Sequence, residues 1–274
     1  MDVKGTQDTK DFYDNVGWRT DEAGVSVDEE LFGTKEDGPL RQRMTDRKWQ
    51  RIREHIRTDT PPDVLEVGCG GSPSIEMLKD CGTYCGADFS SAGLALAAKN
   101  LENHPANARF VEADAVDLPF EDASFDTVYS AHMIYHIVDK ASQSAALQEM
   151  VRVLKPGGTL VLITANPRPL LFPVRMLIRI VADTPVLSQL ARKIKGSSPI
   201  PYRPAKISAY KREFARCQST RVINGGIPST AFNQSVSELR WPTKALWLLF
   251  DALDNRFPTL SAYLGNYAIV LVRK

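Results

Sequence analysis

The stretch Val64-Leu-Glu-Val-Gly-Cys-Gly-Gly-Ser72 is a short apolar run that ends in three closely spaced glycines. The apolar run predicts a buried strand, and the glycines predict a tight turn into a helix near residues 74–79. Glycines in such a turn allow a ligand to approach the backbone N–H groups closely. The stretch therefore indicates a strand, turn and helix of an α/β fold, with a ligand site at the turn.

The regions on either side alternate between apolar strands and helices in the same style. Residues 41–57 predict a helix that ends before Pro61-Pro62. Further segments are expected in the order strand 83–88, helix 91–103, strand 108–114, strand 125–131, helix 141–154, strand 159–165, strand 219–224, helix 242–255 and strand 266–273. Because strands alternate with helices, we predict a Rossmann-like α/β fold with a mostly parallel sheet.

The composition excludes disordered and fibrous chains. Of 274 residues, 43% are hydrophobic, and 34 Lys and Arg balance 33 Asp and Glu. The apolar run 245–250 is far shorter than the ~18–20 residues of a membrane span, and the first residues lack a secretory signal, so we expect a cytoplasmic location. The cysteines lack paired zinc-site spacing and are expected to be reduced, buried thiols: Cys69, Cys81, Cys85 and Cys217.

Carboxylates at two expected strand ends indicate that the ligand contains adenosine. Asp88 lies 20 residues after Gly68, where its oxygens can accept hydrogen bonds from both ribose hydroxyls. Asp114 can accept a bond from an adenine amine, and the N–H of Ala115 can reach a ring nitrogen. Pro73 stands where a dinucleotide-binding loop has its third glycine, which argues against NAD.

Four segments resemble the class I S-adenosylmethionine-dependent methyltransferases. They are Glu66-Val-Gly-Cys-Gly70, Gly86-Ala-Asp-Phe-Ser90, residues 113–130 with Asp-Ala-Val-Asp-Leu-Pro-Phe followed by Ser-Phe-Asp, and Val153-Leu-Lys-Pro-Gly-Gly158. Ser72 departs from the family pattern, which has a glycine there. The resemblance implies a seven-stranded sheet with an antiparallel last strand and S-adenosylmethionine as cofactor.

The resemblance also divides the chain. Residues 1–60 would form an N-terminal lid and helix, and residues 61–274 the methyltransferase domain. The alternation of strands and helices itself breaks off beyond residue 166, so we expect a basic and apolar cap at 167–216, inserted after the fifth strand. Phe12, Tyr13 and Trp18 are candidates for closing the lid over the cofactor.

The same resemblance gives each cofactor-binding residue a role. Glu66 would bind the methionine amino group, while Gly68 and Gly70 would make room for the methionyl and ribose parts. The ribose would bind to Asp88. Phe89 would pack on the adenine, Asp114 would accept from its amine, and Ala115 would donate its backbone N–H. Ser130 and His132 would face the methyl end of the cofactor.

Methyl transfer requires the enzyme mainly to orient the acceptor and exclude water, because the cofactor brings the electrophile. A base helps if the acceptor is a hydroxyl or a protonated amine. His132, Tyr135 and His136 supply two imidazoles and a phenol after the fourth strand and are the candidate catalytic residues. Each histidine could instead be structural; no metal site is predicted, because no third ligand accompanies them.

The basic segment suggests what the acceptor is. Residues 168–216 contain 11 basic and 2 acidic side chains, a net charge of +9. Within it, the bulky apolar run 169–182 carries Arg175 and Arg179, and Trp241, Trp247, Leu248, Leu249 and Phe250 follow later in the chain. This pattern favours a hydrophobic or lipid-like acceptor and peripheral membrane contact through the cap, although a solvated face is an equal alternative. The near-neutral overall charge argues against nucleic acid.

The sequence therefore predicts a methyltransferase that modifies a small molecule at oxygen first, then at nitrogen or carbon. A non-catalytic nucleoside-binding or regulatory protein is the alternative from another class. An NAD-dependent dehydrogenase is a weaker alternative, because the third glycine of its loop is missing.

Overall fold

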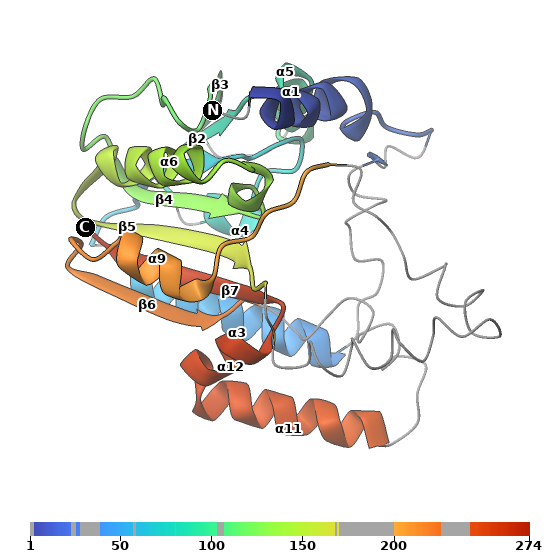
Figure 1. Ribbon diagram of the computed structural model, residues 1–274, viewed down its shortest axis with the longest axis vertical. Helices are drawn as coiled ribbons and strands as arrows, with labels where there is room; N and C mark the ends of the chain where they lie inside the picture. Colours follow the sequence, from blue (N-terminus) through green and yellow to red (C-terminus); the bar gives the residue numbers. More distant parts are fainter. Residues whose placement is uncertain are drawn as a thin grey trace.

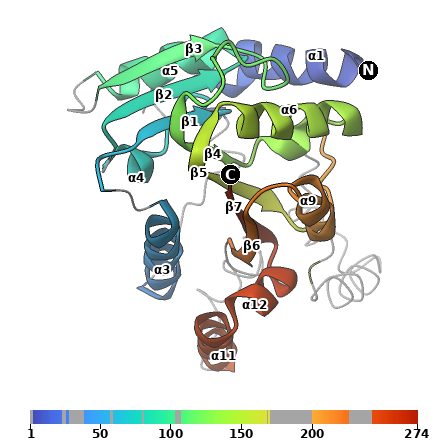
Figure 2. The same ribbon diagram turned by 90° about the vertical axis from the view of Figure 1, so that its left-hand side faces the viewer.

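The computed structural model describes residues 3–22, 26–27, 39–56, 59–79, 81–102, 107–167, 169, 200–225 and 242–274. A seven-stranded sheet runs through this part of the chain in the order β3-β2-β1-β4-β5-β7-β6 (Figures 1 and 2). The strands are β1 Asp63–Val67, β2 Thr83–Asp88, β3 Ala108–Glu112, β4 Phe125–Ala131, β5 Leu154–Ala165, β6 Ser219–Asn224 and β7 Tyr267–Arg273.

The sheet confirms the predicted fold class. The pairs from β3 through β5 are parallel, and β7 runs antiparallel to both β5 and β6. Since β1, β2 and β4 are parallel, Gly68, Asp88 and His132 come at the same edge of the sheet, where each of these strands ends. This carboxyl edge is where α/β sheets bind ligands.

Helices cover both faces of the sheet. Figure 2 shows α6 and α9 on one face and α3 and α4 on the other. Neighbouring residues of a strand point to opposite faces, so Leu65 and Val128 pack with α6 and α9, while Val64 and Tyr129 pack with α3 and α4. The helices are α1 Val3–Phe12, η1 Tyr13–Gly17, α3 Pro39–Ile56, α4 Ile75–Leu78, α5 Ser91–Asn100, η2 Ile134–His136, α6 Lys140–Arg152, α9 Ile207–Glu213, α11 Pro242–Arg256 and α12 Pro258–Leu264.

Ion pairs with two buried aspartates attach α11 to α3. Arg47 Nη1 lies 2.9 Å from Asp251 Oδ1, and Arg51 Nη1 lies 3.0 Å from Asp254 Oδ2. The hydroxyl of Ser261 on α12 donates to Asp254 Oδ1 at 2.7 Å. The C-terminal helices are thereby joined to the helix that precedes β1.

Some element ends differ from the prediction. The helix expected at 141–154 ends at Arg152, because Leu154 already pairs with Phe125 as the start of β5. The strand expected at 108–114 ends at Glu112, and Asp114 forms an isolated bridge with Asp117. The four cysteines have free thiols, but only Cys69 and Cys85 are buried, so the expected burial is wrong for Cys81 and Cys217.

The predicted cap falls only partly within the described residues. Its last part contains α9, whose Ile207 and Tyr210 pack in the sheet core. Arg168 and residues 170–199, with nearly all of the apolar run and six of the eleven basic side chains, lie outside the described part, as does Trp241. In the later helix Leu248 and Leu249 are exposed. None of the described helices is long and apolar enough to cross a membrane.

Candidate functional site

The glycine turn after β1 and the end of β2 are bonded together through Asp88. Its Oδ2 accepts the N–H of Gly70 at 2.8 Å, and its Oδ1 accepts the N–H of Ser90 at 2.9 Å. Gly68 and Gly70 have φ of 79° and 51°, in the left-handed region that favours glycine. Burial raises the pKa of Asp88, while these two N–H donors oppose the rise. The turn therefore places a buried carboxylate at the carboxyl edge.

Glu66 on β1 is a second buried carboxylate. Its Oε2 accepts the N–H of Ser74 at 2.9 Å and the hydroxyl of Tyr84 at 2.5 Å. Burial raises the pKa of Glu66 to about 7, and the charge of Asp88 adds to the rise. Both hydrogen bonds go to Oε2, so Oε1 keeps its lone pairs for another donor. A cation placed beside Glu66 would favour its ionised form.

Residues 3–22, called the N-terminal segment here, contact the glycine turn through Trp18. A Cβ added at Gly70 would come within 2.3 Å of the Trp18 ring, and one at Gly93 within 2.7 Å of Trp18 Nε1. Tyr13 stacks on Trp18 with ring centroids 5.3 Å apart, and its edge contacts Phe89. Trp18 Nε1 is buried, and none of the residues that the structure describes forms a hydrogen bond with it. Aromatic rings thus cover the turn where the ligand is expected.

Polar contacts fasten this segment to the end of β2. Lys10 donates to the carbonyl of Phe89 and forms ion pairs with Asp14 at 3.2 Å and Glu112 at 3.3 Å. The hydroxyl of Ser90 donates to Asp14 at 2.6 Å. Figure 1 shows α1 beside α5, above this edge of the sheet. The segment is therefore held against the end of β2, beside the glycine turn.

The loop after β3 presents Asp114 at the same edge. Asp114 is exposed, and its Oδ1 accepts the N–H of Val116 at 3.1 Å. The N–H of Ala113 donates to the carbonyl of Asp88 at 2.9 Å, which ties the loop to β2. Ala115 is half-buried beside Asp114.

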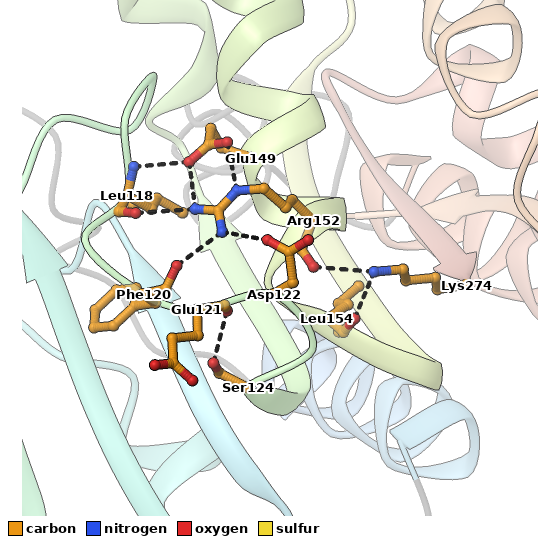
Figure 3. A network of polar contacts seen from close by, with 9 residues as sticks. All are labelled: Leu118, Phe120, Glu121, Asp122, Ser124, Glu149, Arg152, Leu154 and Lys274. Atoms are coloured by element: carbon orange, nitrogen blue, oxygen red, sulfur yellow. Dashed lines mark hydrogen bonds and ion pairs between the residues drawn. The ribbon is translucent and has the colours of Figure 1, made fainter.

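Two residues of α6 hold the continuation of this loop, as Figure 3 shows. Arg152 donates to the carbonyls of Leu118 at 3.0 Å and Phe120 at 2.8 Å, and Glu149 accepts the N–H of Leu118 at 2.9 Å. Arg152 also pairs with Asp122 and Glu149. This network fixes the far end of the loop that carries Asp114.

A different set of side chains follows β4. His132 is exposed, has a φ of 60°, and its Nδ1 lies 3.1 Å from the hydroxyl of Tyr135. The Tyr267 ring contacts His132 edge-on at 4.7 Å, and Tyr202 contacts Tyr135 at 5.0 Å. The Nδ1 of His136 lies 2.9 Å from the carbonyl of Pro201. These five side chains form an aromatic cluster made by His132, Tyr135, His136, Tyr202 and Tyr267.

Both imidazoles of the aromatic cluster are neutral at pH 7. The protein around His132 disfavours its charged form and lowers its pKa, with the charge of Lys48 adding to the shift, while the exposure of the side chain to water limits it. Burial also lowers the pKa of His136. A carbonyl can only accept, so His136 Nδ1 carries the proton and its Nε2 is free to accept another. Within the described residues, no group of three metal-ligating side chains occurs.

Comparisons with known proteins agree with this geometry. A family model described as a methyltransferase domain matches residues 65–162. The matched residues run from β1 into β5, so this similarity covers the part of the chain that carries the glycine turn and Asp88. It is 35% identical over 128 residues to a demethylmenaquinone methyltransferase of Thermus thermophilus, covering 45% of this chain and 57% of that one. It is 30% identical over 197 residues to the O-methyltransferase cnsE of Penicillium expansum, covering 65% and 64%.

Solved structures share the fold of the methyltransferase domain. Phosphoethanolamine N-methyltransferase 2 of Haemonchus contortus, in complex with S-adenosyl-L-methionine, superimposes with a TM-score of 0.59 at 16% identity, over 97% of this chain and 59% of that one. The [4+2]-cyclase SpnF gives a TM-score of 0.54 at 19% identity, over 88% and 84%. The chain spans less than two thirds of the length of the curated relatives it matches.

The structure brings most of the predicted site residues of the methyltransferase domain to one edge. Ser130 differs, since it is completely buried and its hydroxyl has no hydrogen-bond partner among the described residues. Sequence analysis missed Tyr84, Tyr202, Tyr267 and Lys48. Tyr84 stands two residues before Gly86 in a strand, a position that reads as core, and the other three approach His132 or Tyr135 from distant parts of the chain.

Proposed function

We propose that this protein is an S-adenosylmethionine-dependent methyltransferase that modifies a small hydrophobic or lipid-like molecule. The observation that carries the proposal is the pair of buried carboxylates, Glu66 and Asp88, on either side of the glycine turn. In this proposal Glu66 would bind an ammonium group and Asp88 a ribose diol. The named relatives support the acceptor class, since they include demethylmenaquinone, naphthoquinone and O-methyltransferases.

The cofactor would lie along the carboxyl edge from β1 to β3. Its ammonium group would bind Glu66 and its ribose Asp88, above Gly68 and Gly70. The adenine would lie against Phe89, with Asp114 accepting from its amine and the N–H of Ala115 donating to its ring. Tyr13 would close over it. The Trp18 ring would shift, because it now lies where the glycine turn has to meet the ligand.

The methyl acceptor would bind beside the aromatic cluster. The cofactor supplies a methyl group on a positively charged sulfur, so the protein has to position the acceptor and remove its proton. His132 Nδ1–H would donate to the Tyr135 hydroxyl, which leaves Nε2 to accept the proton of an acceptor hydroxyl. The lowered pKa of His132 keeps it neutral and ready to do so. His136, oriented by Pro201, is the second candidate base.

The surroundings of His132 favour oxygen as the methylated atom, ahead of nitrogen and carbon. Lys48 acts on His132 electrostatically and would stabilise an acceptor oxygen that has lost its proton. The rings of Tyr202 and Tyr267 offer apolar surface for the rest of the acceptor. A cytoplasmic location with peripheral membrane contact through the basic segment 167–216 would suit a lipid-like acceptor.

A protein that keeps the fold without methyl transfer is the second candidate. The structural similarity to SpnF, which is named a cyclase, supports this second candidate, because the fold does not by itself determine the reaction. The protein would then bind the nucleoside and leave the acceptor unmethylated.

The test is transfer of a labelled methyl group from S-adenosylmethionine to reduced quinones and other phenolic acceptors. We expect label in the acceptor with the wild type, and a large loss of label when His132→Gln and His136→Gln are combined. Binding of S-adenosylhomocysteine should persist in the double variant. Equal transfer by the double variant would contradict the assignment of the base.

A further inference from the structure

Tyr84 contacts the carboxylate of Glu66 from the neighbouring strand. It lies on β2, where it pairs with Val64 of β1, and is 1% exposed. Its hydroxyl donates to Glu66 Oε2 at 2.5 Å. The ring packs edge-on against Phe110 with centroids 6.4 Å apart. The phenol is therefore fixed by the core and presents its hydroxyl to one carboxylate oxygen.

The hydrogen bond matters because Glu66 is surrounded by groups that do not neutralise its charge. Tyr84 and Tyr129 face it from β2 and β4, Cys69 from the glycine turn, and Asp88 from the end of β2. Burial raises the pKa of both tyrosines and of the cysteine, so these three stay protonated, and Asp88 adds negative charge. The donors that stabilise ionised Glu66 are the Tyr84 hydroxyl and the Ser74 N–H.

We propose that Tyr84 is a positioning residue that keeps Glu66 ionised by binding Oε2, and leaves Oε1 for the ammonium group of the cofactor. The inference rests on the proposed function, because it takes Glu66 as the ammonium site. An O–H donor to a buried carboxylate is among the stronger hydrogen bonds in proteins. Without it the carboxylate would hold its proton more tightly, and the cofactor would have to displace that proton on binding.

The test compares Tyr84→Phe with Tyr210→Phe. Tyr210 is a matched control, since it is a buried tyrosine whose hydroxyl lies 2.8 Å from Thr164 Oγ1, in the core on the other face of the sheet. The pKa of Glu66 is followed by carbon NMR of labelled glutamate in the free protein, with Glu66→Gln assigning the signal. Affinity for S-adenosylhomocysteine is measured from pH 6 to 8.5.

In Tyr84→Phe we expect the Glu66 pKa to rise by about one to two units. Affinity for S-adenosylhomocysteine should be about tenfold lower than in the wild type at pH 7. This difference between variant and wild type should narrow toward pH 8.5, because Glu66 ionises in both. In a Glu66→Gln background, Tyr84→Phe should have no further effect on affinity. A ring-fluorinated tyrosine at position 84, a stronger donor that preserves packing, should lower the Glu66 pKa and serves if Tyr84→Phe does not fold.

Equal Glu66 pKa values and affinities in Tyr84→Phe and Tyr210→Phe would overturn the inference while the proposed function stood. A wild type that does not bind S-adenosylhomocysteine at any pH would overturn the proposed function, and with it the role of Tyr84 in binding. The NMR measurement would still decide whether Tyr84 holds Glu66 ionised.

Discussion

The two halves of the carboxyl edge differ in their chemistry. From β1 to β3 the site is built of carboxylates, and backbone N–H groups bind Glu66 and Asp88 through short hydrogen bonds. From β4 onward it is built of neutral imidazoles and phenols. The carboxylate half can hold a ligand that carries an ammonium group and a ribose. The aromatic half can take a proton and bind a flat, apolar acceptor.

This difference shows why one fold can keep its cofactor and change its acceptor. The carboxylates belong to the glycine turn and to β2, which are bonded together through Asp88. The aromatic cluster draws Tyr202 from the segment after residue 199 and Tyr267 from the last strand. Changes in those distant segments would alter the acceptor side without touching Glu66 or Asp88.

The largest expected effect is on the aromatic half. His132→Gln removes the proton acceptor, so kcat should fall about a hundredfold or more, the usual range for loss of a general base. Affinity for S-adenosylhomocysteine, measured by calorimetry, should change less than about threefold, because the carboxylates are intact. His55→Gln, on α3 and bonded to the carbonyl of Arg51, is the control. A parallel loss of affinity would mean that the two halves are not separate.

Asp88→Asn tests the carboxylate half. The variant keeps the size of the side chain and removes the charge that accepts the ribose hydroxyls, so affinity for S-adenosylhomocysteine should fall about ten- to a hundredfold. Asp126→Asn is the control, since Asp126 pairs with Lys155 at 2.9 Å near the start of β4. Unchanged affinity in Asp88→Asn would contradict the proposal that the ribose binds Asp88.

Cofactor affinity and kcat should depend on pH in different ways, because they rely on groups in different halves of the site. Glu66, with its pKa raised to about 7, is protonated below that pH, so cofactor affinity should rise between pH 6 and 8. His132, with its pKa lowered below the ordinary value, stays mostly neutral over the same range, so kcat should stay level there and fall only at lower pH. Profiles of kcat and of cofactor affinity check this. A kcat that halves near pH 6.5 would show that His132 titrates normally.

The smallest effect is expected at the loop behind Asp114. Arg152→Lys cannot reproduce the planar contacts to Leu118, Phe120 and Glu149, so the free energy of unfolding should fall by about 1 kcal/mol. Affinity for S-adenosylhomocysteine should weaken about twofold. Arg53→Lys, at the Arg53–Glu76 pair, is the control in urea unfolding. A loss no larger than that of the control would show that the network does not hold the loop.

Sequence patterns predicted the carboxylate half better than the aromatic half. Glycine spacing and the position of Asp88 are local signals, because parallel strands bring their ends to one edge whatever follows. β2, β4 and β6 have the predicted bounds, whereas β5 begins five residues early because Leu154 pairs with Phe125. Tyr202 and Tyr267 reach His132 and Tyr135 through tertiary packing, which leaves no spacing in the sequence. From the sequence Tyr84 is indistinguishable from a core residue, and only the structure reveals the hydrogen bond from its hydroxyl to Glu66.

The central claim is that the carboxylate half binds the ammonium group and the ribose that S-adenosylmethionine and S-adenosylhomocysteine share. Calorimetric titration of the wild type with S-adenosylhomocysteine at pH 7, in two buffers of different ionisation enthalpy and with NAD in parallel, tests it most directly. The account predicts one site for S-adenosylhomocysteine, with release of part of a proton as Glu66 ionises, and no binding of NAD. Binding of NAD alone, or of neither ligand, would contradict it.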